Sequence, residues 1–197
     1  MEKVINFYKD NKKSMYFILT IALVGLASGI CFYFLISYND KIKCIDYINK
    51  YIEYIKNRKY FILLLRSMIF NLILLFLIFI CSFSVTGFFT STFIYFLKNF
   101  IIGLYFTLIM KVTNYYTASI LYIFPTNFIY IIIYSTLLLV SLSISTNLLF
   151  SIFKSKTISF KNISRKYLYI FLILVGISTL LSLYDGFILP KILLNFI

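Results

Sequence analysis

The chain has no acidic residue between Glu53 and Asp185, and most of that stretch is isoleucine, leucine, phenylalanine and tyrosine. Such long apolar runs are typical of helices that cross a bilayer rather than of water-soluble domains. The mean hydropathy of the chain, +0.97, and its 62% of hydrophobic residues agree with that interpretation. We therefore predict an all-α integral membrane protein in which residues 1–197 form a single membrane domain.

Five apolar stretches are long enough to cross a hydrocarbon core of about 30 Å. Residues 67–110 carry one charge, and as a single helix they would be about twice as long as the core is thick, so we expect two spans joined by a turn at 86–92. Pro125 should break the fourth span, because proline removes a backbone donor and clashes with the preceding turn. The predicted spans are 15–36, 67–88, 93–110, 128–150 and 167–184.

Residues 40–59, between the first two spans, have the pattern of an amphipathic helix. Asn39 and Asp40 can cap its start, and isoleucines recur at helical spacing from Ile42 to Ile55, with charged residues between them. A helix of this kind is expected to lie in the membrane interface. Its length and mixed charge also suit a contact with a partner protein.

The basic residues predict the orientation of the chain. Four lysines precede residue 14, and residues 154–166 form the densest basic loop, without an acidic residue. The positive-inside rule places both segments in the cytoplasm, so five spans put the C-terminus outside, although the loop at 41–59 carries six lysines and arginines of its own. The net charge of +13 is thus explained by topology and by the lipid bilayer as a partner, and no nucleic acid partner is predicted.

The side chains that most enzymes use are scarce. The chain has no histidine, only six carboxylates, no HExxH motif and no glycine-rich phosphate loop, and its three cysteines lack a metal-binding spacing. Asp185 ends the last span, where the ordinary role of a carboxylate is at a helix terminus or in the interface. We predict no catalytic residue, no cofactor and no metal, and a binding, scaffolding or passage function.

Small and polar residues inside the apolar stretches are candidates for helix packing. Gly25 and Gly29 form a G-x-x-x-G motif, which lets another helix approach closely, either inside the bundle or from another protein. Lys98 can extend back to the head groups, the commoner behaviour, or it can line a polar seam with Asn99. Asn127 follows the proline of the fourth span, where it can bond to backbone carbonyl groups left free by the break.

Several short motifs also occur in a characteristic order. They are the G-x-x-x-G of the first span, YINKYI (47–52) in the amphipathic helix, LKNFIIG (97–103) in the hairpin, FPTN (124–127) before the fourth span and DGFILP (185–190) after the fifth. This combination resembles the SpoIIM (stage II sporulation protein M) family of multi-pass membrane proteins. Asn99 replaces the small residue that is usual after the lysine, and Asp185 stands where glutamate is common. The resemblance implies helix-packing or assembly roles for the matching positions, which are Gly25, Gly29, Lys98, Gly103, Pro125, Asn127, Asp185 and Pro190.

The resemblance also implies what the protein does. Sporulation members of the family anchor the peptidoglycan-degrading proteins SpoIID and SpoIIP during engulfment of the forespore, and a non-catalytic scaffold of this kind is the first functional prediction. Related members occur in circular bacteriocin gene clusters. The alternative is therefore a membrane component for the maturation, export or immunity of a bacteriocin or similar hydrophobic peptide, with that peptide or an ABC transporter as its partner. A structural subunit of a permease is a third alternative.

Overall fold

The computed structural model describes residues 12–113, 126–154 and 160–193, and all the regular secondary structure in these ranges is helical. Five helical stretches there are long and apolar enough to cross a membrane, which confirms the predicted all-α fold with five candidate spans. The protein is a multi-pass membrane protein. The helices are α2 (Lys12–Leu35), α3 (Tyr38–Lys56), α4 (Tyr60–Cys81), α5 (Gly87–Thr113), α7 (Phe128–Lys154) and α8 (Phe160–Leu183), and α8 continues through the π-helical turn η2 (Tyr184–Ile188) into α9 (Leu189–Leu193).

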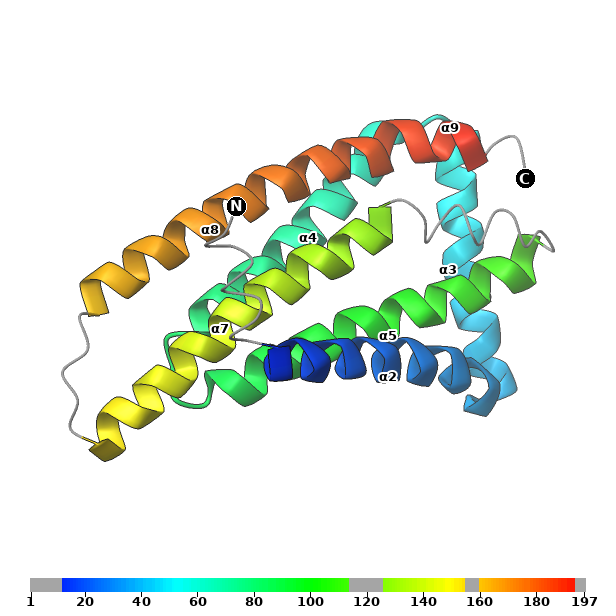
Figure 1. Ribbon diagram of the computed structural model, residues 1–197. Coiled ribbons are helices and arrows are strands. Elements are labelled where there is room, and N and C mark those ends of the chain that lie inside the picture. The colour runs from blue at the N-terminus through cyan, green and yellow to red at the C-terminus, as the bar shows by residue number, and fades with distance from the viewer. Residues whose placement is uncertain (1–11, 114–125, 155–159, 194–197) are drawn as a thin grey trace.

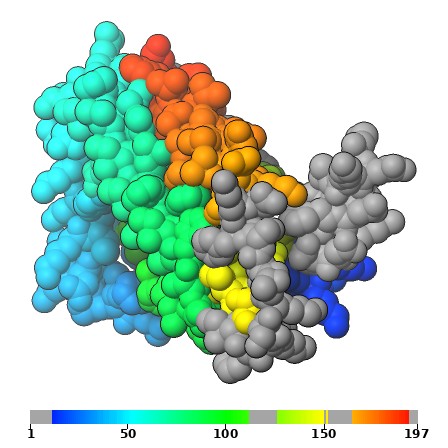
Figure 2. Space-filling model, turned by 90° about the vertical axis from the view of Figure 1, so that its left-hand side faces the viewer, coloured from blue at the N-terminus to red at the C-terminus, as the bar shows by residue number. Residues whose placement is uncertain are grey.

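The five spanning helices form a bundle, and α3 lies across one end of it (Figure 1). Within the bundle, α2 packs most extensively against α5, and α4 packs against α8. Figure 2 shows α4 and α8 side by side on one face of the molecule. Because α3 contacts both α4 and α5, it covers the end of the bundle where α2 ends and α4 begins.

The core consists of two apolar clusters. The larger one fills the bundle and is built around fully buried residues such as Leu75, Tyr134 and Leu137. The smaller one fixes α3 to the bundle, with Ile48 and Ile55 of α3 packed among residues of α2, α4, α5 and α9. The outside of the bundle is also apolar, as expected for a surface that faces lipid tails.

Helix α3 begins two residues earlier than predicted. Its N-cap is Ser37, whose hydroxyl accepts a hydrogen bond from the backbone N–H of Asp40, so neither Asn39 nor Asp40 is the cap. Asp40 instead lies in the first turn, where a negative charge is favourable. The Ser37 hydroxyl also donates a 2.7 Å hydrogen bond to the Asp40 carboxylate, and this bond together with the neighbouring Lys43 lowers the pKa of the Asp40 carboxyl. After α3, the chain turns into α4 through Arg58, whose φ of 55° lies in the left-handed region.

The turn between the second and third spans was predicted too far along the chain. The second span is α4, which begins at Tyr60 and ends at Cys81, and the turn covers residues 82–86 rather than 86–92. The Ser84 hydroxyl donates to the Cys81 carbonyl group, which supports this turn locally. Gly87 then opens α5 so close to Cys81 that a Cβ atom at residue 87 would overlap the Cys81 carbonyl oxygen. The glycine therefore belongs to the tight return of the chain and not to the second span.

Candidate functional site

The three glycines singled out in the sequence lie together at the contact between α2 and α5. A Cβ atom on Gly25 would lie 2.9 Å from the Cβ of Asn99, and one on Gly29 would overlap the carbonyl oxygen of Phe100. From the other side, a Cβ on Gly103 would overlap the carbonyl oxygen of Leu26. In the structure the G-x-x-x-G motif is thus used inside the chain, where it lets the two helix backbones touch.

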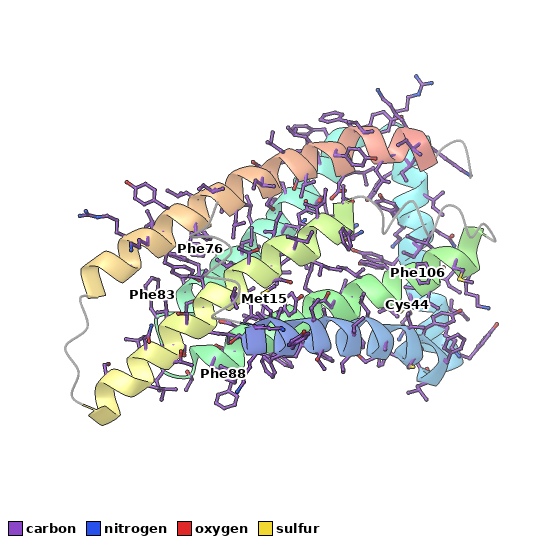
Figure 3. All side chains as sticks on the ribbon, in the orientation of Figure 1. Met15, Cys44, Phe76, Phe83, Phe88 and Phe106 are labelled. Atoms are coloured by element: carbon purple, nitrogen blue, oxygen red, sulfur yellow. The ribbon has the colours of Figure 1, made fainter. Side chains whose placement is uncertain are left out.

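A cavity of about 680 Å³ lies between α3 and the ends of the spans that it crosses. Aliphatic and aromatic side chains form most of its wall, with polar groups from α4, α5, α7 and η2 among them. The ionisable groups other than tyrosine and cysteine that line it are Lys43, Arg66, Lys98 and Asp185, and we call this space the polar cavity. In Figure 3 it is at the end of the molecule marked by Cys44, which is part of its wall, whereas Phe83 and Phe88 lie away from that end.

Lys98 lies at the buried side of the polar cavity. Only 6% of the residue is exposed, and its Nζ donates a 2.8 Å hydrogen bond to the side-chain oxygen of Asn71. The same Nζ is 5.1 Å from the ring centroids of Phe70 and Tyr130 and 5.6 Å from that of Tyr134, which are cation–π distances. The prediction that Lys98 extends to the head groups is therefore wrong, because polar and aromatic partners on neighbouring helices hold it inside the bundle.

Asn99, the predicted companion of Lys98 in a polar seam, faces in another direction. Its side-chain N–H donates to the Tyr95 carbonyl oxygen, and its Cβ lies toward Gly25 of α2. Lys98 and Asn99 are adjacent in sequence and point to different faces of α5. The hydrogen-bond partner of Lys98 is Asn71 of α4, which was not identified from the sequence.

Asn71 connects Lys98 to Asp185 through Ser67. The Asn71 side-chain N–H donates to the Ser67 hydroxyl at 3.3 Å, and the Ser67 hydroxyl donates to Asp185 Oδ2 at 2.9 Å. Ser67 and Asn71 are four residues apart, so they share one face of α4. The result is a continuous line of hydrogen bonds from an ammonium group to a carboxylate, across three helical segments. The four-residue spacing of Ser67 and Asn71 was visible in the sequence, but the helices that this face of α4 would contact were not.

The sequence suggested that Asp185 ends the last helix, but in the structure it does not. It lies in η2, within a helix that continues into α9, because the last span extends beyond residue 184. The next residue, Gly186, is so close to α4 that a Cβ there would overlap the Leu64 side chain. This contact aligns the half-buried Asp185 with Ser67 and the polar cavity.

The charges of the polar cavity are not directly paired with one another. Within the described part of the chain, Lys98 and Asp185 line the same space but form no ion pair within 4.0 Å. Near the exposed side, the Arg66 guanidinium stacks on the Tyr47 ring at 4.4 Å. Burial raises the pKa of the Tyr51 hydroxyl on α3, and the negative charge of Asp185 raises it further.

Of the other predicted positions, Asn127 and Pro190 lie in the described part of the chain, and Pro125 does not. Asn127 is buried and lines the polar cavity with Lys98 and Asp185. Pro190 is buried at the start of α9. Pro125 lies outside the described residues, and the structure begins again with Thr126 and Asn127 in a π-helical turn just before α7. In the described ranges, no three histidine, cysteine, aspartate or glutamate residues are grouped so that they could hold a metal ion.

One comparison with known proteins identifies the chain. The family model described as "Stage II sporulation protein M" matches residues 15–190, a range that includes all of the residues that line the polar cavity. No curated protein and no solved structure shows a significant match to the chain.

Proposed function

The chain belongs to the SpoIIM family, and from that premise we propose that it is a non-catalytic scaffold that anchors peptidoglycan-degrading proteins at the outer face of the membrane during engulfment. The observation that carries this proposal is the outward face of α3. The inward face is fixed to the bundle by buried isoleucines, so α3 is a rigid platform rather than a loop. Its outward face includes exposed residues at helical spacing, namely Ile42, Lys43, Asp46, Asn49, Lys50, Glu53, Lys56 and Asn57.

The charge of this face favours a protein partner over a lipid surface. From Asp46 to Asn57 it combines two carboxylates with two lysines, whose charges balance, and Lys43 before them is paired with Asp40. Helices that bind anionic membranes usually present a basic polar face. A balanced row of charges instead offers complementary pairs that set the position of a docked protein.

The proposed orientation supports the same role. With the N-terminus and residues 154–166 in the cytoplasm, α3 and α9 lie on the outer side of the membrane. Enzymes that degrade peptidoglycan act on that side. The absence of histidine from the chain agrees with a protein that holds enzymes and does no chemistry itself.

A pull-down of the tagged protein from its native membrane in mild detergent, with the bound proteins identified, tests this function. We expect peptidoglycan hydrolases to be recovered with the natural chain and lost with a variant that exchanges two charges, Lys50→Glu with Glu53→Lys. The matched control, Lys50→Arg with Glu53→Asp, keeps both charges and should recover the same proteins. Equal recovery by the exchanged variant would exclude this face of α3 as the platform.

A second candidate function is favoured by the polar cavity. Its apolar wall and buried lysine would also suit a hydrophobic peptide, as expected of a component for bacteriocin export or immunity. Recovery of a small hydrophobic peptide or of an ABC transporter subunit in the same pull-down, without hydrolases, would replace the scaffold proposal with this one.

A further inference from the structure

We propose that the polar cavity binds the headgroup of a glycerophospholipid that carries both a phosphate and a hydrogen-bond donor, as phosphatidylethanolamine and phosphatidylglycerol do. This inference does not depend on the scaffold function. It rests on the buried Lys98 ammonium and the buried Oδ1 atom of the half-buried Asp185, whose bonding capacity the described residues leave partly unused, and on the apolar wall around them.

The first unused capacity belongs to Lys98. An ammonium group has three N–H donors, and within the described residues Lys98 makes one hydrogen bond, to Asn71. Its other near neighbours are aromatic rings, and among the described residues no carboxylate is within 4.0 Å. A buried charge without a counter-ion is costly, and an ionisable group inside a membrane domain commonly marks a binding site. A phosphate oxygen would supply the missing acceptor, and Arg66 at the exposed side of the cavity would attract the same anion.

The second unused capacity belongs to Asp185. Its Oδ2 accepts the hydrogen bond from Ser67, and its Oδ1 is buried and has no partner at hydrogen-bond distance among the described residues, although the Thr126 and Tyr130 hydroxyls lie close to the carboxylate. Because buried carboxylate oxygens are nearly always hydrogen-bonded, an unpaired Oδ1 is a site where a ligand could supply a donor. The ammonium of an ethanolamine headgroup or a hydroxyl of a glycerol headgroup would provide one. A choline headgroup has no N–H or O–H and could not.

The wall of the cavity suits the tail side of such a molecule. Ile101, Leu104 and Leu108 of α5 and Leu63 of α4 contribute apolar surface. Phe70, in the same wall, is 40% exposed on the outside of the bundle, where acyl chains would pass. A space of about 680 Å³ falls in the usual range for a ligand pocket and holds a headgroup with the beginning of its chains, while the rest extends into the bilayer. Inorganic phosphate would use only the charged part.

Native mass spectrometry of the purified full-length chain tests the proposal. The protein would be equilibrated with phosphatidylethanolamine, phosphatidylglycerol and phosphatidylcholine of identical acyl chains, and the lipid that stays bound would be measured. We expect each of the first two lipids to be retained about tenfold more than phosphatidylcholine, the effect of one charge-assisted hydrogen bond. Millimolar inorganic phosphate should not displace either lipid.

Three variants divide the site into its parts. Lys98→Met should weaken retention of all three lipids severalfold, because each carries the phosphate, and should preserve the preference over phosphatidylcholine, which depends on Asp185. Asp185→Asn removes the negative charge but keeps an acceptor, so it should abolish the preference for phosphatidylethanolamine and preserve that for phosphatidylglycerol. Lys191→Met, which removes an exposed lysine of α9 outside the cavity, is the matched control and should change nothing. If Lys98→Met does not fold, Arg66→Gln replaces it, and this variant should likewise weaken retention of all three lipids severalfold.

Three results would overturn the proposal. The first is equal retention of all three lipids by the natural chain, which would mean that the protein does not distinguish their headgroups. The second is displacement of the lipid by inorganic phosphate, which would reduce the cavity to an anion site. The third is a hydrophobic peptide, rather than a lipid, bound to the protein isolated from its native membrane and released by Lys98→Met.

Discussion

Lys98 of α5 and Asn71 of α4 are joined by a 2.8 Å hydrogen bond in the interior of the bundle, and Tyr134 of α7 donates to the same Asn71 oxygen at 3.2 Å. One amide side chain thus receives bonds from two other helices. It also extends the line of hydrogen bonds through Ser67 to Asp185. Asn71 therefore links the buried ammonium to the hydrogen-bonded side of Asp185.

Replacing this amide should therefore destabilise the bundle. Asn71→Leu keeps the approximate volume but leaves the Lys98 ammonium without an acceptor, and we expect a loss of about 3 kcal/mol because a buried charge would be unpaired. The measurement is thermal unfolding in detergent followed by circular dichroism. Combining Asn71→Leu with Lys98→Met removes both partners, so the double variant should be more stable than Asn71→Leu alone. If the two losses simply add, the hydrogen bond is not the reason for the effect.

The close contact between α2 and α5 gives a second prediction. Gly29→Ala would place a methyl group onto the backbone of Phe100, which cannot move without shifting α5, so stability should fall by about 2 kcal/mol. Gly176→Ala is the matched control, because a Cβ there meets nothing within 4 Å and alanine favours the helix. The pair is compared by thermal unfolding. Equal stability of the two variants would show that the helices are not held at this distance.

The number of spans was predictable because it follows from the lengths of apolar runs, a local property of the sequence. The start of the second span was not. The span was predicted to begin at residue 67, just after the charge of Arg66, but in the structure Arg66 lies within α4 and its guanidinium rests on the Tyr47 ring of α3. A charged residue is tolerated there because another helix covers it at the end of the bundle.

The burial of Lys98 was beyond the sequence for a similar reason. Residues near it in the chain offered Asn99 as a partner, and a lone lysine in a span usually extends to the head groups. Its actual partners, Asn71 and Tyr134, come from two other helices, and only the packing of α4, α5 and α7 brings them to one point. Long-range contacts of this kind leave no pattern in one sequence.

A third prediction concerns the hydroxyl groups at the opposite end of the bundle. The Tyr167 hydroxyl of α8 lies 2.6 Å from the Ser82 hydroxyl, which also bonds to Ser141 of α7. Tyr167→Phe should cost about 1 kcal/mol, because it removes one buried hydrogen bond and little volume. Tyr169→Phe, on the same helix but exposed, should leave the unfolding temperature unchanged. A similar effect of both changes would indicate a general response of α8 to the loss of a hydroxyl.

The orientation of the chain is tested by cysteine labelling in intact cells. Cys31, Cys44 and Cys81 are first replaced by serine, and a single cysteine is then introduced by Asn49→Cys on α3 or by Arg165→Cys on α8, both at exposed positions. If the basic segments are cytoplasmic, a membrane-impermeant maleimide should label the α3 cysteine in intact cells and the α8 cysteine only after permeabilisation. The opposite pattern would place α3 and the exposed side of the polar cavity in the cytoplasm. A platform for peptidoglycan-degrading enzymes would then be incompatible with the topology.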